Sequence, residues 1–219
     1  MNRAKPRSFV VAIDGPAASG KGTLARRLAE RFGLAHLDTG KLYRAAAALV
    51  LEAGADPGDA GAAAAAARRV EPARLADPAL TSETVARASS IVAAIPAVRD
   101  ALVALQREFA ARPPGTVLDG RDIGTAVCPD AAVKLFLTAS PAARAERRVR
   151  ELRQRDAAAI YEDVLQDMKE RDARDSQRRV APLAAAPDAV ILDTTRLDAD
   201  QVFERASDII ARALAAHSR

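Results

Sequence analysis

A glycine-rich segment near the N-terminus has the residue types that bind phosphate groups. Residues 15–21 read G-P-A-A-S-G-K, which matches the pattern G-x-x-x-x-G-K of a phosphate-binding loop. Glycines let the backbone curl so that successive N–H groups point into one concavity, and Lys21 reaches the outer phosphates. An ordinary Gly-rich turn before a helix is the alternative reading. Because the motif stands between an apolar run and a helical pattern, it predicts a nucleoside triphosphate site.

The position after the lysine departs from that pattern. The consensus has Ser or Thr there as a magnesium ligand, whereas this chain has Gly22 followed by Thr23. The Gly-Lys-Gly-Thr form resembles nucleoside monophosphate kinases and fits switch GTPases less well. Whether Thr23 meets the metal directly or through water stays open.

Two further polar clusters follow apolar runs. Thr39 stands at an expected helix start with Arg44 one turn later, so the pair suits a phosphate group; a plain N-cap and a solvated charge are the alternative. Asp119, Arg121 and Asp122 follow the next run, and Asp119 resembles the acidic residue that holds magnesium, directly or through water. An Arg–Asp pair that caps a loop is the alternative reading of this cluster.

An arginine-rich segment, residues 170–179, comes later. Arg171, Arg174 with Asp175, and Arg178 line up at helical spacing. Phosphoryl transfer needs several guanidinium groups to stabilise the developing charge, and Asp175 suits a ribose hydroxyl. A surface salt-bridge ladder is the alternative, and four arginines earlier in the chain fit such a solvated face: Arg144, Arg147, Arg148 and Arg150.

The elements that must position these residues alternate along the chain. Short apolar runs predict strands, and apolar residues at period 3.6 or alanine-rich runs predict helices. The expected strands are 9–13, 34–37, 116–118, 133–137 and 189–192, and the expected helices are 21–32, 39–50, 59–69, 83–94, 96–109, 142–155, 161–174 and one from 198 or 200 onward, with a tip at 156–160. Continuous apolar strands indicate a parallel sheet covered on both faces, with ligands bound beyond the carboxyl ends of its strands. The phosphate loop and both polar clusters should therefore converge on one crevice.

Composition bounds the class of protein. The chain has 219 residues, 49% of them hydrophobic but only 3% aromatic, so a core of Ala, Val, Leu and Ile is expected within one domain. The net charge of +4 suits anionic partners, whereas few aromatic residues disfavour dedicated nucleic-acid binding. Cys128 is the only cysteine, so an intramolecular disulfide is excluded and a packing role is favoured. No run spans a membrane and MNRAKPRS lacks a signal segment, so a cytoplasmic protein is expected.

Five segments together resemble the bacterial cytidylate kinase family, within the nucleoside monophosphate kinases. In order they are IDGPAASGKGT, LDTGKLYR, ASSIVAAIPAVR, DGRDIGT and ERDARDSQRRVAPL. The resemblance implies an α/β, three-layer P-loop fold with a five-stranded parallel sheet, a reduced NMP-binding insertion and a short helical lid. It implies a single domain over 1–219, with a monophosphate-binding subdomain at 55–97 and a lid hairpin at 142–176. The implied reaction phosphorylates CMP and dCMP from ATP with Mg²⁺, by a monomer that binds neither nucleic acid nor membrane.

The resemblance also implies roles for individual residues. The ATP phosphates would be held by Gly15, Pro16, Ala17, Ala18, Ser19, Gly20, Lys21, Gly22 and Thr23, and the metal by Thr23 and Asp119. The CMP phosphate would contact Thr39, Arg44 and Arg121. The cytosine would contact Ser90, Arg99, Asp122 and Arg178, and the sugar would contact Arg171 and Asp175. Lys21, Arg121, Arg171 and Arg178 would be catalytic. Cytosine offers an amino donor to Asp122 and Ser90 and acceptors to arginines, whereas uracil presents the opposite pattern.

The chain departs from this family at 59–80, which is mostly alanine where the family has a small β-rich insertion. Leu80 stands where arginine is common, and Lys41 is unusual and suits a further phosphate contact. Two alternatives remain: a kinase of the same fold acting on another small acceptor such as UMP, and a nucleotide-dependent switch or nucleic-acid-binding protein. No N-K-x-D guanine-reading segment is present, which counts against a switch.

Overall fold

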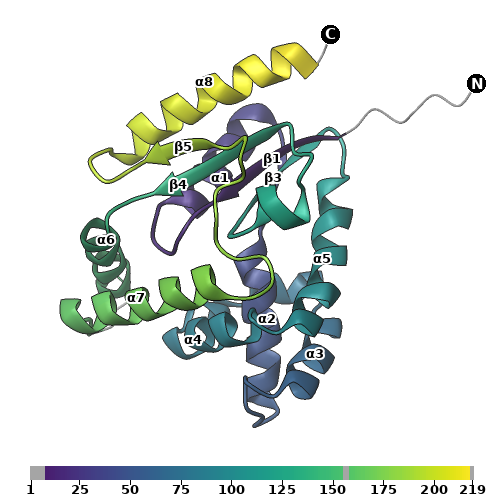
Figure 1. Cartoon of the computed structure of the whole chain (residues 1–219), viewed down its shortest axis with the longest axis vertical. Coiled ribbons are helices and arrows are strands. Elements are labelled where there is room, and N and C mark those ends of the chain that lie inside the picture. Colours follow the sequence, from purple (N-terminus) through teal and green to yellow (C-terminus); the bar gives the residue numbers. More distant parts are fainter. Residues whose placement is uncertain (1–7, 155–157, 218–219) are drawn as a thin grey trace, which may run out of the picture.

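A computed structural model describes residues 8–154 and 158–217. Its centre is a parallel sheet of five strands in the order β2-β3-β1-β4-β5 (Figure 1). The strands are β1 (Phe9–Asp14), β2 (Ala35–Asp38), β3 (Gly115–Gly120), β4 (Val133–Thr138) and β5 (Val190–Asp193). The predicted five-stranded parallel sheet is therefore confirmed, and each observed strand overlaps its predicted range.

Helices connect the strands and cover both faces of the sheet. They are α1 (Lys21–Phe32), α2 (Thr39–Glu52), α3 (Ala60–Arg68), α4 (Glu83–Val92), α5 (Pro96–Ala110), α6 (Pro141–Arg153), α7 (Tyr161–Gln177) and α8 (Ala199–His217). Short 3₁₀ helices at Pro72–Ala76 and Pro78–Thr81 and a π-helical turn at Ile123–Val127 complete the order. Within 55–97, all of it described, every regular element is helical, as expected from its alanine content.

Two apolar clusters lie on opposite faces of the sheet. One joins alternate residues of β1, such as Val11 and Ile13, to Leu28 of α1 and Ile210 of α8. The other joins Ala12 and Leu118 to α2, α3, α4 and α5. Alternate side chains of a strand point to opposite faces, so β1 supplies both clusters. These are the three layers predicted from the continuous apolar strands.

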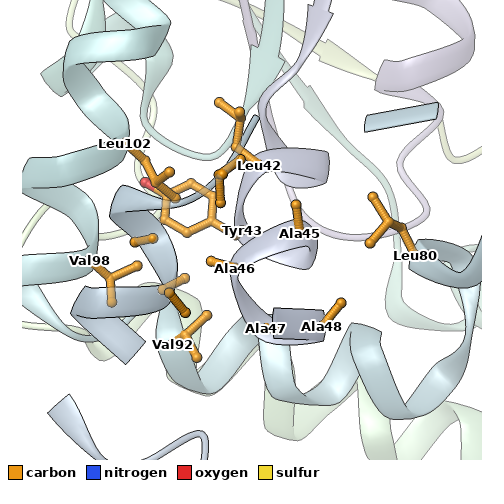
Figure 2. Packing of buried hydrophobic residues seen from close by; sticks show 14 of the residues in the cluster. Leu42, Tyr43, Ala45, Ala46, Ala47, Ala48, Leu80, Val92, Val98 and Leu102 are labelled. Carbon is orange, nitrogen blue, oxygen red and sulfur yellow. The ribbon is translucent and has the colours of Figure 1, made fainter. Parts of the chain in front are cut away.

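Alanine makes the second cluster compact. Ala45, Ala46 and Ala47 of α2 are fully buried, and small side chains let neighbouring helices approach closely. Figure 2 shows them beside the larger Tyr43, Leu80 and Leu102, which fill the remaining space. Alanine and aliphatic residues thus build this core, as the low aromatic content predicted.

Several predictions fall partly outside the described residues: the missing signal segment and the domain over 1–219 include residues 1–7, and the helix at 142–155, the tip at 156–160 and the lid at 142–176 include some of residues 155–157. In the rest of the chain no single helix is long and apolar enough to span a membrane. The bent pair α4–α5, with 102° between its helices, meets the length and composition criteria only when taken together.

Candidate functional site

The loop between β1 and α1 is shaped to receive an anion. Gly15 has φ of 151°, and a Cβ atom there would lie 2.2 Å from the carbonyl oxygen of Leu137, so only glycine fits. Gly20 has φ of 90° and precedes α1, whose N-cap makes no side-chain hydrogen bond. The N–H groups at the start of α1 therefore receive no acceptor from a capping side chain. Together with the partial positive charge of the helix end, they face the loop.

Lys21 carries the loop's charge. Its Nζ donates to the carbonyl oxygen of Pro16 at 3.2 Å. Burial, with a smaller contribution from the neighbouring Arg121, lowers the pKa of Lys21 to about 7 against the opposing effect of Asp119. An anion bound in the loop would stabilise the charged ammonium form, because its negative charge offsets the effects of burial and of Arg121.

One cleft joins the phosphate loop to residues of both polar clusters, as predicted, although Thr39 and Asp122 do not line it. A cleft of about 450 Å³ is lined by Lys21 and Thr23 of α1, Asp38 of β2, Arg44 of α2, and Asp119 of β3. Arg121, Arg171 and Arg174 line the same cleft. Its size is within the usual range for small-molecule sites, and guanidinium groups from several elements suit a phosphorylated ligand.

Asp119 is the buried carboxylate of this cleft. Its Oδ1 pairs with Nε2 of His36 at 2.8 Å, and its Oδ2 faces Gly22 of α1. Burial raises the pKa of Asp119 above its ordinary value, against the hydrogen bond from His36. Among the described residues no three His, Cys, Asp or Glu side chains gather into a metal cage. Mg²⁺ commonly takes one or two carboxylates and completes its shell with water and substrate phosphates, so Asp119 and the exposed Thr23 fit that donor set.

Asp122 joins two arginines in a buried cluster beside the cleft. Its Oδ2 accepts from Nη2 of Arg99 and its Oδ1 from Nη2 of Arg178 at 3.2 Å. Nη1 of Arg99 is buried without a hydrogen-bond partner, and the guanidinium lies 5.7 Å from the ring centroid of Tyr43. Buried donors of this kind usually serve a ligand or an ordered water.

Arg121 and Asp175 form a second pair. Nε of Arg121 donates to Oδ2 of Asp175 at 2.9 Å. Burial alone would raise the pKa of Asp175, but Arg121 and Arg171 together hold it below its ordinary value. Burial lowers the pKa of Arg171 to about 9, with Arg121 adding to the effect, and Nε of Arg171 lacks a hydrogen-bond partner. The cleft therefore holds concentrated positive charge.

The remaining predicted residues lie at different depths. Ser90 accepts from Nε of Arg174 at 3.3 Å, and Arg44 donates to the carbonyl oxygen of Leu80 at 3.3 Å. Thr39 is buried, is not among the cleft-lining residues, and donates to the carbonyl oxygen of Asp119 at 2.8 Å. Lys41 is exposed and also lies outside the cleft lining.

Two predictions for the arginine-rich segments are wrong: the solvated position of Arg144, and the helical alignment of Arg178 with Arg171. Arg144 is buried rather than solvated: it donates to the carbonyl oxygen of Ala17 at 3.3 Å and pairs with Asp172 at 2.6 Å. Arg178 is not on the helix with Arg171, because α7 ends at Gln177 and Arg178 has extended backbone angles. Tertiary contacts override the helical spacing in both segments.

A second cavity of about 390 Å³ adjoins the first. The two share Ala18, Gly20 and Thr23 of the phosphate loop and α1, together with Glu151 of α6. The second cavity continues between Arg147 of α6, Thr194 after β5 and Val202 of α8. The phosphate loop thus stands between two hollows, an arrangement with room for two ligands.

Sequence reasoning missed this second cavity, the burial of Arg144, and Asp14 at the end of β1. Asp14 is 4% exposed and accepts two backbone hydrogen bonds from a segment more than a hundred residues away. A charged residue at the end of an otherwise apolar strand was the one available signal.

The comparisons with known proteins agree with this geometry. Residues 11–212 match the family model "Cytidylate kinase". The chain is 59% identical to the cytidylate kinase of Rhodospirillum rubrum over 93% of this chain and 97% of the relative, and 58% identical to that of Granulibacter bethesdensis over 93% and 97%. Among solved structures it resembles a gluconokinase from Sinorhizobium meliloti, with TM-score 0.51 and 16% identity over 96% of this chain and 94% of that one. The last likeness concerns the fold alone.

Proposed function

Because the chain belongs to the cytidylate kinase family, we propose that it transfers the γ-phosphoryl group of ATP to CMP and dCMP, giving ADP and CDP or dCDP. The observation that carries the proposal is the pair of hollows that meet at the phosphate loop. A donor and an acceptor nucleotide need such adjoining sites, since in-line transfer requires their phosphates end to end.

The donor would occupy the second cavity and the loop. Its phosphates would lie against Gly15–Thr23, where N–H groups at the start of α1, Lys21 and the helix end supply positive charge. Its base would lie in the hollow between Arg147, Thr194 and Val202. The guanidinium of Arg147, held by Thr194, is placed to lie against an aromatic base.

The acceptor would occupy the larger cleft. Arg44 and Arg121 line it and suit the monophosphate, with Thr39 behind them, while Arg171 and Asp175 suit the sugar. Ser90, Arg99, Asp122 and Arg178 would read the base. Asp122 accepts from the cytosine amino group, and the unpartnered Nη1 of Arg99 donates to a ring acceptor. Uracil would leave these buried groups unpaired, which opposes its binding.

In the transfer step, an oxygen of the CMP phosphate attacks the γ-phosphorus while the bond to the β-phosphate oxygen of ATP breaks. Lys21, Arg121, Arg171 and Arg178 would stabilise the charge that develops on the transferred group. Mg²⁺ held by Thr23 and Asp119, directly or through water, would neutralise donor phosphate charge. His36 orients Asp119 for that role.

Residues 142–176 would act as a lid and 55–97 as the acceptor-binding subdomain. The α6–α7 hairpin approaches α4 in Figure 1, and two ion pairs, Arg148–Glu83 and Arg87–Asp167, join them. Closure of this kind keeps water from the γ-phosphate during transfer. The enzyme would act as a cytoplasmic monomer.

Steady-state assays with ATP and a panel of acceptors test the proposal. CMP and dCMP should be phosphorylated with the highest kcat/KM, followed by UMP, with AMP and shikimate inert. Omission of Mg²⁺ should abolish turnover. Turnover of UMP in preference to CMP would favour the alternative acceptor, and absence of CMP turnover would overturn the proposal.

A further inference from the structure

Asp14 is a buried charge that none of the proposed roles uses. It ends β1, directly before Gly15, and only 4% of it is exposed. A carboxylate in such a place is costly unless its oxygens are hydrogen-bonded. Its partners therefore indicate what it does.

Both oxygens of Asp14 hold the segment that follows Asp122. Oδ1 accepts from the N–H of Ile123 at 2.8 Å, and Oδ2 accepts from the N–H of Gly124 at 2.7 Å. A carboxylate is the side-chain group that offers two equivalent acceptors to two successive N–H groups. A Cβ atom at residue 124 would lie 3.4 Å from Oδ2 and 3.2 Å from Cδ of Lys134, so glycine lets the backbone approach the carboxylate.

These bonds fix one particular peptide group. The peptide between Asp122 and Ile123 donates its N–H to Asp14, while its carbonyl oxygen accepts from the N–H groups of Ala126 at 2.9 Å and Val127 at 3.2 Å in the π-helical turn. With both ends of that peptide held, the backbone of Asp122 cannot rotate freely. The direction of its side chain toward Arg99 and Arg178 is set in the same way.

The segment before this peptide is anchored by Asp14 as well. Asp14 and Gly120 are paired in the β1–β3 ladder, so one residue of β1 holds the chain on both sides of Arg121 and Asp122. Arg121 then reaches Asp175, and Asp122 reaches the two arginines. Asp14 also adjoins the phosphate loop, so it connects the donor and acceptor ends of the site.

From this geometry we propose that Asp14 is a positioning residue for acceptor selectivity: it holds the Arg121–Asp122 segment in the orientation that reads the acceptor. This inference rests on the proposed function, because it assigns the selectivity of the same cleft. Asp14 itself touches neither nucleotide.

The test compares Asp14→Asn and Asp14→Ala with Thr116→Val. Asparagine keeps one acceptor and turns an amide N–H₂ toward the other N–H, so it breaks one of the two bonds. Thr116→Val removes a different buried hydrogen bond, from Thr116 to the carbonyl oxygen of Ala110, on the adjacent strand β3. Because Thr116 is at the opposite end of β3 from Arg121 and Asp122, loss of this hydrogen bond should lower stability without moving the Arg121–Asp122 segment.

In Asp14→Asn, the ratio of kcat/KM for CMP to that for UMP should fall about tenfold, which is typical when a group that orients a binding residue is lost. KM for ATP should stay within about threefold of wild type, and Thr116→Val should keep the wild-type ratio. If both Asp14 variants keep the wild-type ratio and lose only thermal stability, Asp14 is a structural residue and the inference is wrong. If the wild-type protein does not phosphorylate CMP, the proposed function itself fails.

A second measurement uses the wild-type protein and varies the pH. Burial, with a smaller contribution from Asp122, raises the pKa of Asp14 to about 6 against the opposing effects of the two N–H groups and Lys21. Cys128 also faces this carboxyl, and burial raises the pKa of its thiol to about 11, above the range tested; the stem of Lys134 lies on the same side. As pH falls from about 7.5 to about 5.5, protonation turns one oxygen into a donor, so the wild-type CMP/UMP ratio should fall. Ionisation of the substrate phosphate affects CMP and UMP alike, so it does not change their ratio of kcat/KM. A ratio that stays constant across this pH range would contradict the inference.

Discussion

Replacement of Asp122 tests whether the buried cluster beside the cleft reads the acceptor base. Asp122 is 4% exposed and holds two guanidinium groups, those of Arg99 and Arg178. In Asp122→Ala both arginines lose their carboxylate, and Arg99, 3% exposed, has no other carboxylate partner among its ion pairs in the described residues. In Asp122→Asn one acceptor oxygen remains, and the new amide can donate to O4 of uracil.

The magnitudes follow from burial. Loss of one partner of a buried ion pair typically costs about 3–5 kcal/mol, so the free energy of unfolding of Asp122→Ala should fall by that amount. Loss of a buried acceptor for the cytosine amino group is worth about 1–3 kcal/mol, or roughly a 5- to 150-fold fall in the CMP/UMP ratio of kcat/KM. Asp122→Asn should lose less stability, and its ratio should fall because UMP gains a partner while CMP loses one.

Denaturant unfolding and steady-state kinetics with both substrates give these two quantities. Glu52→Ala is the control, because it removes an exposed carboxylate that pairs with Arg74 at the far end of α2, about 20 Å along the helix from Thr39. It should leave the ratio unchanged. A collapse of stability with an unchanged ratio in both Asp122 variants would show that Asp122 only balances the arginines, and the assignment of base reading would be wrong.

Three further perturbations test other parts of the site. Lys21→Ala should lower kcat by about a hundredfold or more, because one preorganised donor to the transferred group is lost; unchanged single-turnover rates would contradict this. Arg144→Ala should lower the free energy of unfolding by about 2 kcal/mol and raise KM for ATP, because buried Arg144 joins the phosphate loop to Asp172; a KM equal to that of wild type would argue against this link. Glu83→Gln combined with Arg87→Gln should raise KM for both nucleotides while the free energy of unfolding changes by less than about 1 kcal/mol, since the replaced side chains of Glu83 and Arg87 are 47% and 64% exposed. Amide hydrogen exchange in α7 should be faster in that double variant, and unaltered exchange would show that these ion pairs play no part in lid closure.

The fold was largely predictable because its signals are local. The apolar run at Phe9–Ile13, the loop glycines and Gly33 after α1 each act through their own backbone or their neighbours. Parallel pairing and layered helices then follow from continuous apolar strands. The cleft was predictable for the same reason, since parallel strands bring their carboxyl ends to one edge of the sheet.

The remaining features depend on contacts between distant parts of the chain. Asp14 meets Ile123 and Gly124, and Arg144 meets Ala17, so neither role shows in local spacing. The helical spacing of Arg178 was misleading, because α7 ends at Gln177 and Arg178, with extended backbone angles, pairs with Asp122. The nucleotide contacts of individual residues, and the lid and subdomain at 142–176 and 55–97, stay predictions.

The central claim is that the two cavities that meet at the phosphate loop bind two nucleotides with their phosphates end to end. A crystal structure with a bisubstrate ligand, adenosine joined to cytidine through a chain of five phosphates, tests it most directly. We expect adenine beside Arg147, the phosphates along Gly15–Thr23 and toward Arg44 and Arg121, and cytosine beside the Arg99–Asp122 pair. A ligand that occupies only one of the two hollows, with the cytidine in solvent or elsewhere on the surface, would contradict it.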